Sequence, residues 1–248
     1  MYAEPTISTT LEDGSKTEAP KGITVGEALS LGPKDSDRAL VAGMVNNEVR
    51  SLSYELRIRA TVTPIYLDTV EGQRVYRRSL CFLLTVAVSQ AFPERRLVIG
   101  HSLGNSYFYH FDEDETTAED VEKLSESFRS LVEQDLIIQR DVSSYEDALQ
   151  YFESHGMLES ARLLEGRNDS EVPVYRCGAT MDISHGPLVD RTGMLAYFRL
   201  QPYGHGFLLE FPHRSDPTRV VSEERSAMLF GIYREYKQWG EILNVSSV

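Results

Sequence analysis

The sequence predicts an α+β fold, in which helices and strands follow one another in an irregular order. Three observations favour this class. A strongly apolar segment at residues 80–92 has the composition of a buried helix, a short helix and three β-rich runs precede it, and a mixture of capped helices and β-rich runs follows it. No internal repeat is evident, so we expect two packed units with a boundary at Asp68–Gln73, where Gly72 interrupts the pattern.

Composition and charge exclude several classes of protein. The chain has 248 residues, of which 41% are hydrophobic and 25% charged, as in ordinary soluble domains. Its net charge of −13 argues against sequence-independent binding of nucleic acid, because such binding depends on neutralising phosphates. No run approaches the length of a membrane span and no signal peptide is visible, so we expect a cytoplasmic protein that does not contact membranes. We expect Cys81 and Cys177 to be reduced core thiols.

The first 70 residues predict a tail and a small domain. Residues 1–20 offer little to bury, so we expect them to be disordered. A helix is expected over Ile23–Leu31 with Thr24 as its N-cap, and Asn46-Asn47 suits a tight turn between strands. A helix, a hairpin and a further strand in this order are typical of a small β-grasp (ubiquitin-like) unit. The expected strands are Ala39–Val45, Val49–Leu52 and Ala60–Leu67.

The central helix is the segment around which we expect the chain to fold. Leu80–Phe92 is apolar on nearly every side and too short to cross a bilayer, so it predicts a helix buried in protein, ended by Pro93. We expect Arg77 and Arg78 in its first turn, where the helix dipole disfavours cations. Such a pair of arginines needs carboxylate partners or an anionic ligand, and for Arg77 we favour a salt bridge to an acidic residue.

The second half of the chain predicts helices and strands in alternation. Strands are expected over Arg96–Gly100 and Ser106–Phe111, joined by a turn at His101–Asn105. Capping patterns beginning at Thr117 and Ser144 predict two helices. The other expected elements are a strand over Leu136–Gln139, a helix over Met157–Glu165, strands over Val172–Cys177, Ala179–Ser184, Met194–Leu200 and Gly206–Phe211, and an amphipathic helix over Glu223–Leu243.

The order of these motifs resembles part of the threonyl-tRNA synthetases. A β-grasp unit, a buried helix, VIGHSLGNSYFYHF, two capped helices and YRCGATMDISHGPLVDRTGML correspond to a TGS domain followed by an editing domain. In that family an HxxxH motif and a D-[LM]-C-R-G-P-H turn line a zinc-type editing site. The turn keeps Asp182, Gly186 and Pro187. The four positions that would carry the metal ligands have all changed type, and they are Arg78, Phe82, Ser184 and Leu188.

A second resemblance covers the sequence from about Ile23 to its end. This part of the chain is similar to the N-terminal module of uridine-kinase-like (nucleoside kinase) proteins, which precedes a P-loop kinase domain, in the motifs VNNEVRSLSYEL, VYRRSLCFLL, GHSLGNSYFYHF, GFLLEFPHRSDP and REYKQWGEILNV. This resemblance implies a TGS-like domain over 21–70, an editing-like domain over 71–215 and a helix in 216–248 that leads toward the kinase domain. No GxxxxGK[ST] motif occurs, so we expect no phosphate transfer from ATP by this chain.

The residues expected to line a site are Arg78, His101, Asp182 and His185. The synthetase-like fold would bring the start of the central helix and the Asp182–His185 turn together, and Arg and His donors suit a small anionic or nucleotide-like ligand. The simpler alternatives are that His101 lies in a β-turn and that Asp182 caps one. A nucleophilic Cys177 or Ser184 has no assignable base. We expect no metal and no cofactor.

Two functions follow from this set of residues. The first is a non-catalytic ligand-binding or regulatory module of a nucleoside-kinase-like protein. The second is a hydrolase that deacylates aminoacyl-tRNA or a small aminoacyl ester without metal. The changed ligand positions favour the first, and tRNA remains a partner that the net charge disfavours.

Overall fold

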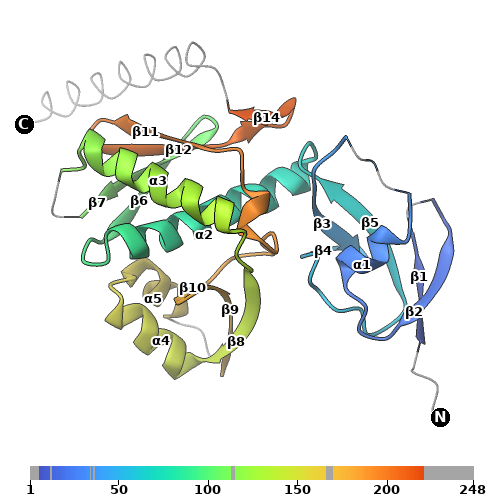
Figure 1. The fold of residues 1–248 in the computed structure, drawn as a ribbon. Coiled ribbons are helices and arrows are strands. Elements are labelled where there is room, and N and C mark those ends of the chain that lie inside the picture. The colour runs from blue at the N-terminus through green and yellow to red at the C-terminus, as the bar shows by residue number, and fades with distance from the viewer. Residues whose placement is uncertain are drawn as a thin grey trace, which may run out of the picture.

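The structure is a computed structural model that describes residues 6–11, 13–33, 35, 37–112, 115–165 and 170–220. The fold is α+β, as the sequence predicts. A first unit of β1 to β5 lies beside a second unit that runs from α2 to β14, and the long helix α2 extends from the first unit into the middle of the second (Figure 1). No helix among the described residues is long and apolar enough to cross a membrane.

The first unit is a five-stranded sheet with one helix packed on it. The strand order is β2-β1-β5-β3-β4, and β1 runs parallel to β5, as in a β-grasp arrangement. Helix α1 begins with a capping box in which Thr24 accepts from Glu27, and it buries Val25 and Ala28 against the sheet. The elements are β1 (Thr6–Thr10), β2 (Lys16–Pro20), α1 (Val25–Ser30), β3 (Leu40–Val45), β4 (Glu48–Arg50) and β5 (Ala60–Tyr66). The Asn46-Asn47 turn is confirmed, with φ of 47° and 69°.

The prediction of a disordered tail over residues 1–20 is wrong for the residues that the structure describes. Strands β1 and β2 form a hairpin, and β1 continues the sheet by pairing Thr9 with Ala60 of β5. Alternate side chains of the hairpin are buried, among them Ile7, Thr9 and Ala19. A few apolar residues are enough to order the hairpin because β1 pairs with β5. Composition alone cannot predict that pairing.

Helix α2 (Val70–Ala91) starts about two turns earlier than expected. Its N-cap is Thr69, whose hydroxyl accepts from the Gly72 backbone N–H at 3.0 Å. Arg77 and Arg78 therefore lie in the interior of the helix, and the prediction that they occupy its first turn is wrong. The early turns bury Val75 and Tyr76 beside polar residues that are half-buried or exposed, and this mixed pattern is less visible in sequence than the fully apolar stretch that follows.

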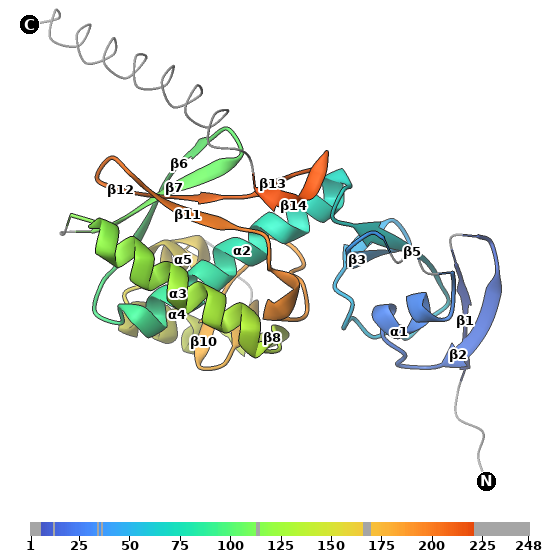
Figure 2. The same ribbon diagram turned by 45° about the horizontal axis from the view of Figure 1, so that its top comes forward.

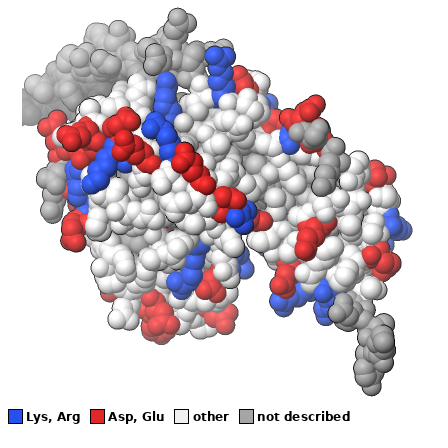
Figure 3. Space-filling view, viewed as in Figure 1, with Lys and Arg blue, Asp and Glu red and all other residues white. Residues whose placement is uncertain are grey.

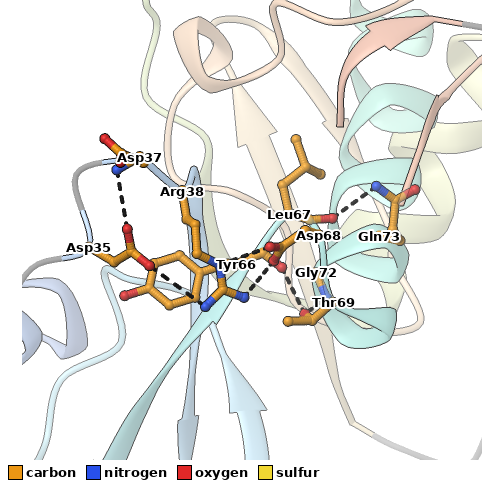
Figure 4. Close-up of polar contacts among 9 residues, drawn as sticks. All are labelled: Asp35, Asp37, Arg38, Tyr66, Leu67, Asp68, Thr69, Gly72 and Gln73. Atoms are coloured by element: carbon orange, nitrogen blue, oxygen red, sulfur yellow. Dashed lines mark hydrogen bonds and ion pairs between the residues drawn. The ribbon is translucent and has the colours of Figure 1, made fainter. Parts of the chain in front are cut away.

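The junction between β5 and α2 is held by close polar contacts (Figure 4). The Gln73 side chain donates to the Leu67 carbonyl at 2.9 Å, and the Thr69 hydroxyl donates to the Tyr66 carbonyl at 2.7 Å. Arg38 stacks over the Tyr66 ring and donates both to Asp68 Oδ1 at 2.6 Å and to Asp68 Oδ2 at 2.8 Å. These contacts fix the direction in which α2 leaves the first unit.

In the described part of the chain, the second unit has three sheets, of which the two larger ones are arranged around α2 and the third is a small two-stranded hairpin (Figure 2). A four-stranded sheet of order β11-β12-β7-β6 lies on one side, together with α3, and a three-stranded sheet of order β10-β9-β8 carries α4 and α5 on the other. The elements are β6 (Leu97–Leu103), β7 (Ser106–Phe111), α3 (Ala118–Gln134), β8 (Gln139–Ser144), α4 (Tyr145–Ser154), α5 (Leu158–Leu164), β9 (Glu171–Cys177), β10 (Thr180–Asp182), η1 (Thr192–Met194), β11 (Arg199–Tyr203), β12 (Gly206–Glu210), β13 (Pro212–His213) and β14 (Asp216–Val220).

Three expected elements differ from the structure. His101 lies within β6, which continues past a bulge between Ile99 and Ser102, so the turn begins at Gly104. The strand expected over Leu136–Gln139 begins only at Gln139, and that expected over Met194–Leu200 begins at Arg199 after the short helix η1. A short apolar run in the sequence does not show at which residue a strand begins to pair with its neighbour, so these boundaries could not be predicted. The helix expected over Glu223–Leu243 lies outside the described residues.

We predict that Gly72→Ala destabilises the protein, because a Cβ at this position would lie 2.0 Å from the Tyr66 carbonyl oxygen. That atom belongs to the backbone of the β5–α2 junction and cannot move without shifting the strand. Overpacking of this kind costs about 1–3 kcal/mol, which chemical denaturation would measure. Gln90→Ala, at an exposed position of the same helix, is the control; equal stability of the two variants would contradict the tight junction.

Candidate functional site

One face of α2 lies along the chain segment that contains β10 and the turn after it. Residues 78, 82, 85 and 89 are spaced by four, three and four positions, so they lie on one side of the helix. Polar contacts join this side, and the adjacent Ser79, to the segment 180–189. The pairs are Ser89 with Thr180 at 2.7 Å, Thr85 with Asp182, Arg78 Nη2 with the Pro187 carbonyl at 3.2 Å, and the Val189 N–H with Ser79 Oγ at 2.9 Å.

Asp182 is the most strongly perturbed carboxylate of this contact. Its Oδ1 accepts from Ser160 Oγ of α5 at 2.7 Å and from the Ile183 N–H at 2.8 Å, and the Thr85 side chain also hydrogen-bonds to it. The carboxyl group is buried although the residue as a whole keeps some exposure. Burial raises the pKa of Asp182 to about 6, against the lowering effect of these hydrogen bonds. Asp182 therefore joins three elements and changes charge near neutral pH.

Arg78 lies flat against the turn after β10. A Cβ on Gly186 would lie 2.9 Å from the Arg78 Cζ, so glycine at this position allows the guanidinium to approach. Burial, with a smaller contribution from the charge of Arg74, lowers the pKa of Arg78. Its Nε is buried without a hydrogen-bond partner, and no described carboxylate forms an ion pair with it. The salt bridge favoured for Arg77 is not found among the described residues either, since Arg77 donates to the Asn105 side-chain oxygen and lies over the Phe211 ring.

His185 and His101 are placed differently. His185 lies on the turn beside Gly186 with its side chain exposed. His101 lies on β6 with its ring 5.6 Å from that of Phe108. Phe108 packs in a small cluster with Leu103 and Leu208, whereas its neighbour Tyr109 packs with α2 in the main core, so His101 lies on the sheet face away from α2. The structure brings Arg78, Asp182 and His185 to one region and does not bring His101 there.

The metal-ligand positions of the resembled synthetases lie at this same contact but are chemically different. Phe82 and Leu188 are buried in the main core with 4% and 0% of their surface exposed, and the Phe82 ring meets that of Tyr175 edge-on at 6.4 Å. The Ser184 hydroxyl donates to the Gly186 carbonyl at 2.9 Å. A guanidinium, a phenyl ring, a hydroxyl and an isobutyl group do not fit zinc, which requires imidazole, thiolate or carboxylate donors.

The two cysteines do not resemble catalytic thiols. Burial raises the pKa of Cys177, and it raises that of Cys81 to about 11, although the Tyr109 hydroxyl lies 3.3 Å from the Cys81 sulfur. A nucleophilic cysteine has the opposite perturbation, because its thiolate must be stabilised. Both cysteines are free thiols in the structure, as expected.

Sequence reasoning missed Thr85, Ser160 and Tyr175, which surround the predicted site residues. Thr85 could have been predicted from the sequence, because it follows Arg78 by seven positions and therefore lies on the same side of a helix. Ser160 and Tyr175 come from other elements, and no spacing in the sequence connects them to Asp182 or Arg78.

The chain is similar to threonine–tRNA ligases. It is 31% identical to that of Acetivibrio thermocellus over 196 residues, which are 78% of this chain and 31% of the ligase. It is 33% identical to that of Symbiobacterium thermophilum over 197 residues, or 78% of this chain and 30% of the ligase. With the ligase of Citrifermentans bemidjiense the identity is 28% over 235 residues, or 94% of this chain and 36% of the ligase.

The chain thus spans about a third of the length of the curated relatives it matches. No protein-family model matches it. The similarity supports the first resemblance, to threonyl-tRNA synthetases, over most of the chain. The resemblance to uridine-kinase-like proteins and the TGS assignment stay predictions.

We predict that Asp182→Asn changes how stability depends on pH. The folded-state pKa of about 6 lies above the ordinary value of 3.8, so the folded protein binds the proton more tightly than the unfolded chain does. The stabilisation from the protonated carboxyl is complete below pH 4 and is lost as the pH rises through about 6.

The wild-type protein should therefore lose stability relative to Asp182→Asn between pH 4 and pH 7, by on the order of 1–3 kcal/mol. Urea denaturation of both proteins across this range measures the difference. Glu146→Gln, at an exposed position of α4, controls for general charge effects. A difference between wild type and Asp182→Asn that stays constant with pH would contradict the buried, proton-binding carboxyl.

Proposed function

We propose that this chain is a ligand-binding or regulatory module related to the editing region of threonyl-tRNA synthetases, and that it does not hydrolyse aminoacyl esters. The observation that carries the proposal is the burial of Phe82 and Leu188 in the main core. In the resembled family these two positions hold histidine ligands that line the editing site. Here they hold side chains that pack against neighbours, which leaves no donors at two of the four positions.

The remaining polar groups suit binding better than hydrolysis. Arg78 offers a guanidinium with no carboxylate partner among the described residues. His185 adds an exposed imidazole on the turn that Arg78 contacts. Such donors recognise carboxylate or phosphate through charge-assisted hydrogen bonds. Asp182 is hydrogen-bonded to Ser160 and Ile183, so its main part is to hold the turn in position. The ligand proposed is accordingly a small anion or a nucleotide-like molecule.

A metal-free hydrolase is the second candidate, favoured by the raised pKa of Asp182. A carboxyl group with a pKa of about 6 can take a proton from water near neutral pH, as a general base must. The hydrolytic role needs Asp182 to reach a water molecule with the oxygen that Ser160 and Ile183 do not use, beside its contact with Thr85, and needs Arg78 to stabilise the oxyanion. Replacement of Asp182 by Asn would then abolish activity while leaving ligand binding in place.

tRNA is a partner suggested by the names of the relatives, and the charge distribution weighs against it. The net charge is −13, and acidic and basic side chains alternate over the face shown in Figure 3 without forming a broad basic surface. Several arginines on the described surface pair with acids, as Arg176 does with Asp141 at 3.0 Å. A small ligand needs only one local cationic site, which this chain has at Arg78.

The wider assignment to a uridine-kinase-like protein is also a proposal. It rests on the motifs in α2, β6–β7 and β12–β14 that resemble the accessory module of those kinases. In that arrangement the TGS-like residues 21–70 and the editing-like residues 71–215 act on a kinase domain rather than on an attached synthetase. The module would report the presence of its ligand to that domain.

We predict that the chain neither retains zinc nor deacylates aminoacyl-tRNA. Serine- and threonine-charged tRNA would be incubated with the 248-residue chain, with a threonine–tRNA ligase as the positive control, and zinc would be measured by elemental analysis after dialysis. We expect ester loss at the rate seen without protein and well under one zinc per chain, because the donor set does not fit the metal. Ester hydrolysis that disappears in Asp182→Asn would establish the second candidate instead.

A further inference from the structure

Two arginines from different elements, Arg78 and Arg140, lie near the hydroxyl of Tyr175, and a third, Arg74, lies close to Arg78. Arg74 and Arg78 are four residues apart on one side of α2, and Arg140 faces Tyr175 across the β8–β9 pair. The charges of Arg140 and Arg78 both act on the Tyr175 hydroxyl, which also hydrogen-bonds with the Leu188 backbone. The cluster thus lies where α2, β9 and the turn after β10 meet.

Few carboxylates offset this positive charge. Glu71 reaches Arg74 only at 4.0 Å, at the outer limit of an ion pair. Asp190 lies near Tyr175, but its carboxylate accepts from Ser53 Oγ at 3.1 Å and from the backbone N–H groups of the same loop. Among the described carboxylates none forms an ion pair with Arg78 or Arg140.

The lack of a described carboxylate partner for Arg78 and Arg140 is unexpected in a chain of net charge −13. Most arginines of the described surface have an acidic partner, including Arg176, which neighbours Tyr175 on β9 and pairs with Asp141. Arg74 and Arg78 repel each other, and Arg78 loses hydration through its burial against Gly186 and Pro187. Arg78 is therefore both repelled by a like charge and partly stripped of water. Binding of an anion beside these arginines would offset both costs.

We propose that Arg74, Arg78 and Arg140 form a binding site for a phosphate group, carried by the ligand of this module. The inference rests on the proposed function, since it names the chemical class that the module recognises. A phosphate has three or four acceptor oxygens and close to two negative charges, and it can take hydrogen bonds from several guanidinium groups at once. A monocarboxylate has two oxygens and one charge, so it would engage one of the three arginines well.

The test is a calorimetric titration of the 248-residue chain with inorganic phosphate at low ionic strength, where exposed charges are least screened. Acetate serves as the carboxylate probe and uridine as an uncharged probe. We expect saturable binding of phosphate, at least about tenfold tighter than that of acetate. Arg78→Gln should weaken phosphate binding by at least about tenfold, the value of one charge-assisted hydrogen bond.

Further variants separate a binding role from a folding role. Arg140→Gln changes an exposed residue of β8 and should weaken phosphate binding several-fold without lowering the midpoint of thermal unfolding. Arg78→Lys keeps the charge but loses the planar fork, and it should fall between wild type and Arg78→Gln. Arg129→Gln, on the exposed surface of α3, should bind phosphate as the wild type does.

Absence of saturable phosphate binding, or equal affinity in the wild type and the Arg78→Gln, Arg140→Gln double variant, would overturn the phosphate site. If uridine binds while phosphate does not, the module still binds a ligand and only this inference fails. Hydrolysis of aminoacyl-tRNA would overturn the proposed function whatever the phosphate titration shows, so the two failures are distinguishable.

Discussion

The burial of helix α2 is the constraint on which the rest of the structure depends. Leu80, Leu83, Leu84, Val86 and Ala87 have none of their surface exposed, so the helix must be covered on several sides at once. Full burial of one such leucine contributes about 1.5–3 kcal/mol. The four-stranded sheet, α3 and the segment from β10 to the turn each supply one covering surface, and the last of these carries the candidate site.

The polar face of α2 explains why the site has its position. A buried helix keeps hydroxyl groups where partners satisfy them, and the segment 180–189 supplies partners for these hydroxyls and for one nitrogen of Arg78. Ser79 takes the Val189 N–H and Ser89 meets Thr180, so the two ends of the contact are fixed. Asp182 then has little freedom, and its burial follows from the packing around it rather than from a charge partner.

The sequence predicted the features that arise within one element. Four such features are confirmed, because each depends on neighbouring residues: the apolar stretch of α2, the N-cap at Thr24, the capping box at Thr117 and the turn at Asn46-Asn47. The hairpin at the N-terminus was missed because its stability comes from pairing with β5, where the partner of Thr9 is Ala60. His101 was misplaced for a similar reason, since a bulge in β6 keeps it in the strand.

The candidate site divides in the same way. Arg78 and the Asp182–His185 turn come together as the synthetase resemblance implies, since both positions are set by the fold. The partners that give them their chemistry could not be read from the sequence, because Ser160 and Arg140 reach the site from α5 and β8. The resemblance to the synthetases thus predicted where the site lies, whereas its hydrogen-bond partners and charges come from residues of other elements.

The most direct measurement of the central claim is the stability of Leu188→His and Phe82→His, with and without zinc. If both positions are core, each histidine buries an unsatisfied polar group and should lower the free energy of unfolding by about 2 kcal/mol or more, and zinc should not restore it. Leu163→His, at a position with 44% of its surface exposed, is the control and should have little effect. Stable histidine variants that gain stability from zinc would show an open metal pocket and contradict the account.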